Sequence, residues 1–258
     1  MKISIIIPAY NEEEIIEKTI KKTYGILNKK KYDFEIIVVN DNSDDKTEKI
    51  IDRLSKTNKK IKPIHKKSNT RGPTGMGSAL KFGFKHCRGD IIIPLMADLS
   101  DDPNEIIQLV KKIFDGFDVV CGSRFIKGSK IIGYPRTKMI FNRIYNRLFA
   151  FLFSLEVKDI SNAFKAYRKS VIDLIKPKSN NFAITAEILL KAKMFGFKIA
   201  EVPVSWHGRT KGESKFGSFS PVFIVTKVPK IGYQYGVLAL TLWFKFLHKK
   251  LKKILNVD

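Results

Sequence analysis

Residues 88–103 read RGDIIIPLMADLSDDP, and this stretch decides the fold. It contains an apolar run at 91–96 with the length and β-branching of a buried parallel strand. The run ends abruptly in polar residues, and Pro103 opens a helix-like segment. Ligands of open α/β sheets bind at the carboxyl ends of the strands. We therefore expect a ligand site at the cluster of Asp98, Ser100, Asp101 and Asp102. The other interpretation is structural, with Asp101 or Asp102 merely capping the helix that follows.

The chain around this stretch alternates between strand-like and helix-like segments. Apolar runs at 3–7 and 34–39, and a shorter one at 61–65, are each followed by apolar residues at helical spacing. This alternation predicts an α/β fold, in which a mostly parallel sheet has helices on both faces. A second acidic cluster begins at Asp41, and Ser43 or Asp44 is expected to cap the next helix. A parallel sheet places both acidic clusters at the same edge, as a binding crevice requires.

The composition is strongly basic. The 258 residues include 48 Lys and Arg against 25 Asp and Glu, which gives a net charge of +23. Such a charge indicates an anionic partner, which could be nucleic acid, a phospholipid surface or a phosphorylated substrate. The sequence has no recognisable nucleic-acid-binding motif, so we expect no nucleic-acid partner. The first apolar run is too short for a signal peptide, and the two cysteines have no metal-ligand spacing, which together predict a cytoplasmic protein.

Two stretches combine apolar residues with basic ones. Residues 139–155 read MIFNRIYNRLFAFLFSL and are apolar nearly all round, interrupted by Arg143 and Arg147. They could form a buried core helix, but the arginines and phenylalanines fit an amphipathic helix in a membrane interface better. Residues 231–244 carry no charge but are too few to span a bilayer, and five lysines follow. We therefore expect a globular domain at 1–216 and an amphipathic basic tail at 217–258 that binds an anionic membrane surface peripherally, on its inner face.

Six motifs, in this order, resemble those of a known enzyme family. SIIIPAYNEE at 4–13, EIIVVNDNSDDKT at 35–47 and GDIIIPLMADLSDDP at 89–103 resemble the nucleotide-binding half of family 2 glycosyltransferases, which have the GT-A fold. GSRF at 122–125, DISNAFKAYR at 159–168 and EVPVSWHGRTKGESK at 201–215 resemble polyprenyl-phosphate sugar synthases, of which the dolichol-phosphate mannose synthases are the best known. The resemblance covers residues 3–216 and assigns the GT-A fold to that domain.

The resemblance implies a nucleoside-diphosphate sugar as donor and Mg²⁺ or Mn²⁺ as cofactor. The nucleotide would be bound by Pro8, Tyr10, Glu12 and Asp41, and the metal by Asp98 with Ser100. Asp101, Asp102 or water could complete the metal shell, because both ions prefer hard oxygen ligands and Mg²⁺ keeps several waters. Two positions depart from the family pattern, since Asn40 and Met96 stand where the family often has aspartate. The missing carboxylate at Met96 weakens the expected metal site.

The resemblance further implies an inverting glycosyltransferase that moves a hexose onto a polyprenyl phosphate at the cytoplasmic membrane face. Mannose is the favoured sugar, and GDP-mannose is its donor. A phosphomonoester with a second pKa of about 6 is largely dianionic at neutral pH, so it needs cations around it rather than a general base. The catalytic residues would then be Asp98 and the three cations Arg124, Arg209 and Lys215.

A different acceptor would change the chemistry expected at the site. The alternative function keeps the fold and donor but transfers the sugar to a saccharide hydroxyl, as in cell-wall or surface-polysaccharide synthesis. A hydroxyl must lose its proton during attack, so this reaction requires a carboxylate base. Asp159 and Glu187 are the available candidates.

Overall fold

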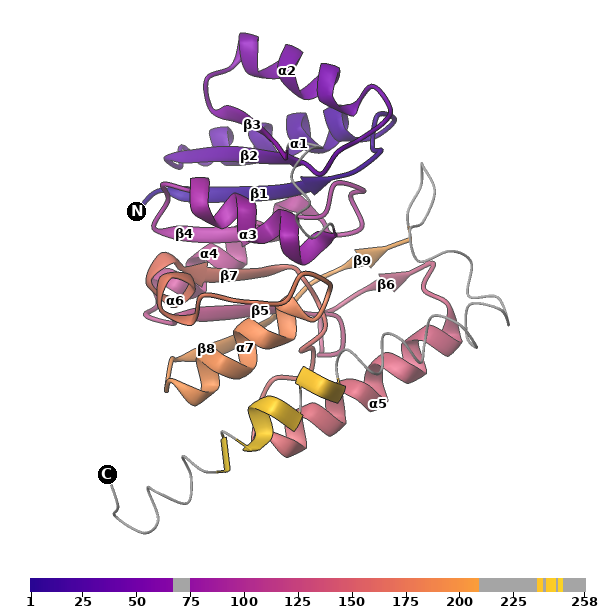
Figure 1. Ribbon diagram of the computed structural model, residues 1–258, viewed down its shortest axis with the longest axis vertical. Coiled ribbons are helices and arrows are strands. Elements are labelled where there is room, and N and C mark those ends of the chain that lie inside the picture. The colour runs from indigo at the N-terminus through magenta and orange to yellow at the C-terminus, as the bar shows by residue number, and fades with distance from the viewer. Residues whose placement is uncertain (67–74, 209–235, 239, 245, 248–258) are drawn as a thin grey trace.

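The structure of this chain is a computed structural model that describes residues 1–66, 75–208, 236–238, 240–244 and 246–247. Within these residues a seven-stranded sheet crosses the molecule in the order β3-β2-β1-β4-β7-β5-β8 (Figure 1). Its strands are β1 (Ile3–Ala9), β2 (Phe34–Asn40), β3 (Ile61–His65), β4 (Ile91–Pro94), β5 (Val119–Ser123), β7 (Lys165–Arg168) and β8 (Ile199–Pro203). Every pair is parallel except the two pairs of β7, which lies antiparallel between β4 and β5. The predicted α/β fold with a mostly parallel sheet is confirmed.

Helices cover both faces of this sheet, because alternate side chains of each strand point to opposite sides. On β1, Ile3, Ile5 and Ile7 pack in one core with α1 (Ile16–Lys29), α2 (Thr47–Thr57) and α4 (Ile106–Phe114). Ile6 of the same strand packs in the other core with α3 (Met76–His86), α6 (Lys169–Ile175) and α7 (Ile184–Met194). The near-continuous apolar sequence of β1 follows from this burial on both faces.

The turns after β2 and β4 meet at one edge of the sheet. β1 lies between these two strands and is parallel to both, so their carboxyl ends point the same way. The expectation that the Asp41 and Asp98 clusters share an edge is therefore confirmed. Asp102 caps the short 3₁₀ helix η1 (Pro103–Glu105), where its side chain accepts from the Asn104 N–H, so the structural interpretation holds for this aspartate. The expected cap of α2 is wrong: the helix begins at Thr47, whose N–H donates to Asp45 rather than to Ser43 or Asp44.

The second half of the chain adds a long helix outside these layers. α5 (Arg136–Leu152) follows β6 (Ile131–Ile132), which pairs with β9 (Trp206–His207) in a separate two-stranded sheet. Described residues near the C-terminus lie beside α5 (Figure 1), where Leu242 is buried and the Phe246 ring lies 5.7 Å from that of Phe153. Part of the predicted 217–258 tail thus packs on the globular domain, and the domain boundary stays a prediction. No helix among the described residues is long and apolar enough to cross a membrane.

Candidate active site

Two loops at the carboxyl edge of the sheet, after β1 and after β2, are tied to each other. The Asn11 N–H donates to Ser43 Oγ (3.1 Å), and the Asp44 N–H donates back to Asn11 Oδ1 (2.9 Å). The Glu12 N–H donates to Thr47 Oγ1 at 2.8 Å. These reciprocal bonds satisfy backbone donors that precede α1 and α2, and they fix the two loops as one surface.

The four residues predicted to bind a nucleotide lie along this surface. Pro8 of β1 pairs in register with Val39 of β2. Just after the end of β2, the Asp41 N–H donates to the carbonyl of Ala9, the last residue of β1, at 2.9 Å. Tyr10 is exposed beyond the end of β1, whereas Glu12 is buried at the start of the turn into α1. The structure therefore brings Pro8, Tyr10, Glu12 and Asp41 to the same edge of the sheet.

The Asp41 carboxylate is held by two donors, one on each oxygen. Lys66 Nζ donates to its Oδ1, and the Gly75 N–H donates to its Oδ2 at 2.9 Å. Lys66 also donates to Ser78 Oγ of α3 (3.0 Å), which links the ends of β2, β3 and α3. A carboxylate has about four lone-pair sites, so these two bonds leave capacity for the donors of a base. Sequence reasoning missed Lys66, because a lysine in a chain with 48 basic residues carries no signal of its own.

The predicted metal residues lie in the turn after β4. The Ser100 N–H donates to Asp98 Oδ1 at 3.0 Å, which folds the turn around that carboxylate. Ser100 is buried, and its carbonyl accepts from the His207 N–H of β9 at 2.9 Å. Met96, where a carboxylate is usual, is partly buried and packs against the hydrophobic core. The side chain that replaces the missing ligand therefore has a packing role.

Asp101 supplies a second carboxyl beside Asp98. The pKa of Asp101 is raised to about 7, first by burial and then by the negative charge of Asp98, while Arg124 acts in the opposite direction. Its backbone forms a bridge with Trp206 of β9. A divalent cation would relieve the repulsion of two neighbouring carboxylates, and their oxygens are the hard ligands that Mg²⁺ and Mn²⁺ prefer. The residues present thus fit such an ion despite the loss at Met96.

Arg124, a predicted phosphate ligand, is buried in an ion pair. Its Nε and Nη2 donate to the two oxygens of Asp159 at 2.7 and 2.9 Å, and Nη2 also donates to Ser161 Oγ at 3.0 Å. Burial alone would raise the pKa of Asp159, but the charge and hydrogen bonds of Arg124 outweigh it and lower that pKa. Asp159 is therefore a fully engaged carboxylate that fixes the plane of the guanidinium.

The other candidate base, Glu187, is likewise engaged. It lies buried on α7, where its carboxylate accepts from the backbone N–H groups of Lys178 and Ser179 and from Lys191 Nζ. Burial would raise its pKa, but these hydrogen bonds lower it. As in Asp159, both carboxylate oxygens of Glu187 already accept hydrogen bonds, so neither is placed to accept a proton from an acceptor hydroxyl.

The start of α5 approaches the ion pair. The ring centroid of Tyr134 lies 5.7 Å from the Arg124 guanidinium carbon and 5.2 Å from Lys138 Nζ. The pKa of Lys138 is lowered, first by burial and then by the charge of Arg124, while the charge of Asp98 opposes this shift. Lys138 is thus a further cation near Asp98 and Arg124, and no sequence motif marked it. Arg209 and Lys215 lie outside the described residues.

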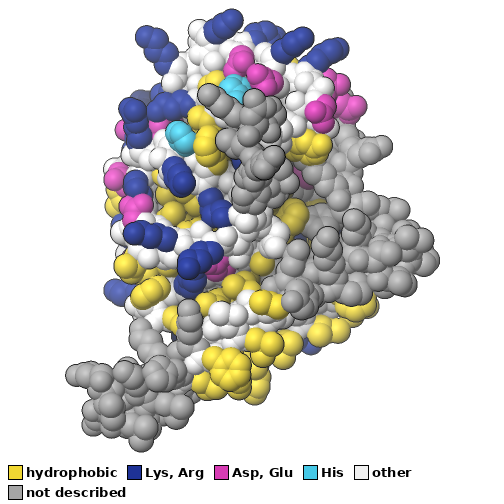
Figure 2. Space-filling model, viewed as in Figure 1, with side chains coloured by type: hydrophobic (Ala, Val, Ile, Leu, Met, Phe, Trp, Pro, Cys, Tyr) yellow, Lys and Arg dark blue, Asp and Glu magenta, His cyan; other side chains and the backbone are white. Residues whose placement is uncertain are grey.

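The outer face of α5 is apolar. Large apolar side chains recur along α5 at helical spacing and are exposed, and that of Phe151 is 83% exposed. The face consists of Ile140, Phe141, Ile144, Leu148 and Phe151, and we call it the α5 apolar face. Only Asn146 and Phe149 of α5 are buried, with Tyr145, Ala150 and Leu152 partly buried against the core, so this helix is not a core helix. Figure 2 shows hydrophobic side chains gathered at the lower end of the molecule, below a surface rich in Lys and Arg.

Comparisons with known proteins agree with this arrangement. The sequence model of glycosyl transferase family 2 matches residues 4–175. The chain is 34% identical over 217 residues to the dolichol-phosphate mannosyltransferase of Pyrococcus furiosus, and 31% identical over 220 residues to glycosyltransferase AglD of Haloferax volcanii. Each alignment covers 83% of this chain, but the chain spans only 59% and 34% of those two proteins, respectively.

A solved structure shares the fold. Glucosyl-3-phosphoglycerate synthase from Mycobacterium tuberculosis, in complex with Mn²⁺, uridine diphosphate and glucosyl-3-phosphoglycerate, matches with a TM-score of 0.69 at 17% identity. The match covers 93% of this chain and 79% of that one, and it confirms the expected GT-A fold. The match of the family model over residues 4–175, together with the two curated relatives, shows that the chain belongs to glycosyl transferase family 2.

Proposed function

We propose that this enzyme is an inverting glycosyltransferase that moves a hexose, with mannose from GDP-mannose as the favoured donor, onto a polyprenyl phosphate. One observation carries the proposal. The first turn of α5 contains Lys138, a cation near Asp98 and Arg124, and the rest of the helix has an exposed apolar face. A lipid phosphate has the matching two parts, an anionic head and an apolar chain. The relative from Pyrococcus furiosus, whose name states a dolichol-phosphate acceptor, supports the same acceptor class.

The donor would lie along the surface formed by the β1–α1 and β2–α2 loops. Asp41 would accept hydrogen bonds from the base, with Pro8, Tyr10 and Glu12 forming the floor and rim of that pocket. Asp98 and Ser100 would hold Mg²⁺ or Mn²⁺, with Asp101 as a further oxygen donor. When bound, such an ion neutralises charge on the diphosphate leaving group. The neighbour solved with Mn²⁺ and uridine diphosphate supports a metal of this kind.

The acceptor phosphate would be positioned by cations and would attack without a general base. Arg124, Arg209 and Lys215 are the proposed contacts, and Lys138 adds to the positive field that two mutually repelling phosphate groups require. The engagement of Asp159 and Glu187 with other groups supports this chemistry, because neither carboxylate is placed as a base. Asp159 would instead keep the Arg124 guanidinium in one orientation.

The α5 apolar face would lie in the interface of the cytoplasmic leaflet. Arg143 and Arg147 are exposed on the same helix, so they can meet anionic lipid head groups while the phenylalanines enter the acyl boundary. Exposed apolar residues near the C-terminus, Val237, Leu240 and Phe244, would extend this face. The enzyme would thereby act peripherally, where a polyprenyl phosphate presents its head group.

The proposal is tested with purified full chain, anionic vesicles containing a short polyprenyl phosphate, and a panel of radiolabelled nucleotide sugars. We expect label to enter the organic phase as a lipid-linked sugar, with GDP-mannose as the best donor. If label passes only to soluble saccharide acceptors, the acceptor is a hydroxyl and the alternative function replaces this one.

A further inference from the structure

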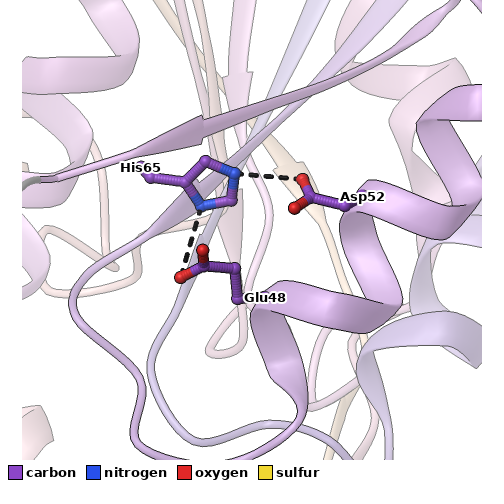
Figure 3. Close-up of side chains that lie close together, drawn as sticks. All are labelled: Glu48, Asp52 and His65. Atoms are coloured by element: carbon purple, nitrogen blue, oxygen red, sulfur yellow. Dashed lines mark hydrogen bonds and ion pairs between the residues drawn. The ribbon is translucent and has the colours of Figure 1, made fainter.

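Asn40 lies at the centre of a polar cluster beside the predicted base-binding residue Asp41. The cluster also contains Glu48 and Asp52 of α2 and His65 of β3, which face one another in Figure 3. We propose that Asn40 is a positioning residue for the nucleotide donor: Glu48 and His65 hold its amide, and the amide holds the loop that carries Asp41. The inference rests on the proposed function, because it assigns Asp41 to the donor nucleotide.

The hydrogen bonds of the cluster are mutually consistent in only one orientation of the amide. Asn40 Nδ2 donates to Glu48 Oε2 at 2.9 Å and lies 3.4 Å from His65 Nδ1. Since Nδ2 can only donate, Nδ1 accepts, and the proton of the neutral imidazole sits on Nε2, which donates to Asp52 Oδ1 at 3.0 Å. Asn40 Oδ1 then accepts from the Ser43 N–H at 3.0 Å. A flipped amide would place an oxygen against the Glu48 carboxylate and an NH₂ group against a backbone donor.

The same side chains could be read as a metal centre. Ligand atoms of Glu48, Asp52 and His65 lie within 4.8 Å of one another. However, the two carboxylates approach different nitrogens of the ring in Figure 3, so in this arrangement the imidazole contacts both of them without an ion. The Asn40 amide also bonds to both Glu48 and the nearer ring nitrogen. Hydrogen bonds account for the contacts of Asn40 and Asp52 in this cluster, and metal binding becomes an outcome of the test.

The network reaches Asp41 by two routes. Asn40 Oδ1 holds Ser43 while the intervening Asn42 adopts a φ of 61°, and Ser43 Oγ in turn accepts from the Asn11 N–H. By the second route, the backbone carbonyl of Asn40, which any residue at this position would supply, accepts from the Lys66 N–H at 3.0 Å, and Lys66 Nζ donates to Asp41. Asn40 is only 1% exposed, so it acts on a nucleotide through these neighbours rather than by touching it.

The network also explains why this chain has asparagine where aspartate is frequent in its family. An aspartate at position 40 would still accept from the Ser43 N–H, but its second oxygen would face the Glu48 carboxylate. That repulsion disappears if a proton enters between them, or if Glu48 is replaced by an amide that donates. Asn40 and Glu48 are therefore a complementary donor–acceptor pair, and E48Q should restore what N40D alone destroys.

The experiment compares the variants N40D, E48Q and N40D/E48Q in the full chain. GDP and UDP binding is measured by calorimetry, donor KM and kcat by turnover, and the ring nitrogens of His65 by ¹⁵N NMR. E17Q is the matched control, since it makes the same Glu-to-Gln change in α1, where Glu17 pairs with Arg53 of α2.

We expect N40D to weaken binding of the preferred nucleotide by about tenfold or more, the loss typical of one hydrogen bond to a charged group. Donor KM should rise with kcat nearly unchanged, because only ground-state positioning is lost. His65 Nδ1 should gain a proton in N40D, and N40D/E48Q should recover binding to within about threefold of the parent, a difference below 1 kcal/mol. E48Q alone should weaken binding less than N40D does, since a glutamine oxygen still accepts from Asn40, and the control E17Q should bind as the parent does. If N40D does not fold, N40A removes the same bonds without a new charge and should show the same KM effect.

Several outcomes would overturn the inference. One is a folded N40D or N40A that binds nucleotide as the parent does, and another is a double variant no better than N40D. Stoichiometric Zn²⁺ that shifts the His65 ring signals of the parent would make the cluster a metal site. If the parent itself binds neither GDP nor UDP, it is the proposed function that fails.

Discussion

The Arg124 guanidinium and the Asp159 carboxylate form a two-point ion pair in the interior, at 2.7 and 2.9 Å. Asp159 is fully buried, and it also accepts from Ser161 Oγ and the Asn162 N–H, each at 3.1 Å. The pair therefore joins the end of β5 to the segment before β7. Because both charges are buried and each faces the other directly, removal of either partner leaves a buried charge without its nearest counter-charge.

Arg124 and Asp159 should show strong coupling in a double-mutant cycle. R124M or D159L alone should lower the free energy of unfolding by about 3–5 kcal/mol, as expected when one partner of a buried pair is lost. The double variant R124M/D159L should cost much less than the sum, since no uncompensated charge remains. Urea unfolding measures all four proteins. Additive costs, within about 0.5 kcal/mol, would show that the two charges do not stabilise each other.

Asp98 and Met96 should respond in opposite directions to substitution. D98A should abolish metal-dependent turnover, and excess chelator should stop the parent enzyme. M96D should tighten Mn²⁺ binding in the presence of GDP, but it should also cost about 0.5–3 kcal/mol of stability because Met96 packs against the core. Calorimetric Mn²⁺ titrations and thermal unfolding separate the two effects. D102A is the control, since Asp102 caps η1 and pairs with Lys22 at 3.0 Å. Full activity of the parent in chelator would contradict the metal site.

The α5 apolar face should determine vesicle binding. I144E and F151E should each weaken binding to anionic vesicles by about tenfold or more, because burial of a large apolar side chain contributes about 1.5–3 kcal/mol. L174E is the matched control, as Leu174 is 55% exposed on α6, away from this face. Co-sedimentation at several salt concentrations gives the measurement. Equal losses for all three variants would mean that any exposed apolar residue acts alike and that α5 has no special role.

Glu35 should make stability depend on pH in the acid range. Burial would raise its pKa, but hydrogen bonds from Lys62, Ser4 and the Arg88 N–H lower it below the usual value of 4.5. A carboxyl with a lowered folded-state pKa stabilises the fold above its unfolded pKa, and this contribution is lost as pH falls through the folded value. E35Q should therefore cost about 1–3 kcal/mol at pH 7 and progressively less below pH of about 4.5. E156Q, an exposed control, should show no such convergence, and a gap for E35Q that is independent of pH would contradict the assignment.

Local patterns predicted the parallel half of the fold well. The apolar runs at 3–7, 34–39 and 91–96 correspond to β1, β2 and β4, because a strand buried on both faces is largely apolar. The shorter run at 61–65 corresponds to β3, a partly buried strand at the edge of the sheet. The positions of Asp41 and Asp98 followed from this, since parallel strands share one carboxyl edge. The insertion of β7 between β4 and β5 could not be predicted in the same way, because it depends on pairing between segments far apart in the chain.

The charged residues of the site were harder to assign from sequence. Asp159 carries the signal of a potential base, yet its partner lies 35 residues away, and only the tertiary structure shows the pair. Lys66 and Lys138 resemble every other lysine of a basic chain, although one contacts Asp41 and the other approaches Asp98. The acceptor for the first N–H of α2 was misassigned, because Ser43, Asp44 and Asp45 are all capable acceptors. Ser43 Oγ accepts from Asn11 instead, and Asp45 accepts from the Thr47 N–H.

The central claim is that the nucleophile is a lipid phosphate held by cations, and one matched pair of acceptors tests it most directly. Initial rates are measured with GDP-mannose and either a polyprenyl phosphate or the polyprenol of the same chain length, in the same vesicles. The account predicts transfer to the phosphate alone. It also predicts that R209A and K215A each lower kcat/KM for that acceptor by about 10- to 150-fold, the equivalent of 1.5–3 kcal/mol for a charge-assisted contact. Transfer to polyprenol at a comparable rate, or R209A and K215A enzymes as active as the parent, would contradict the account.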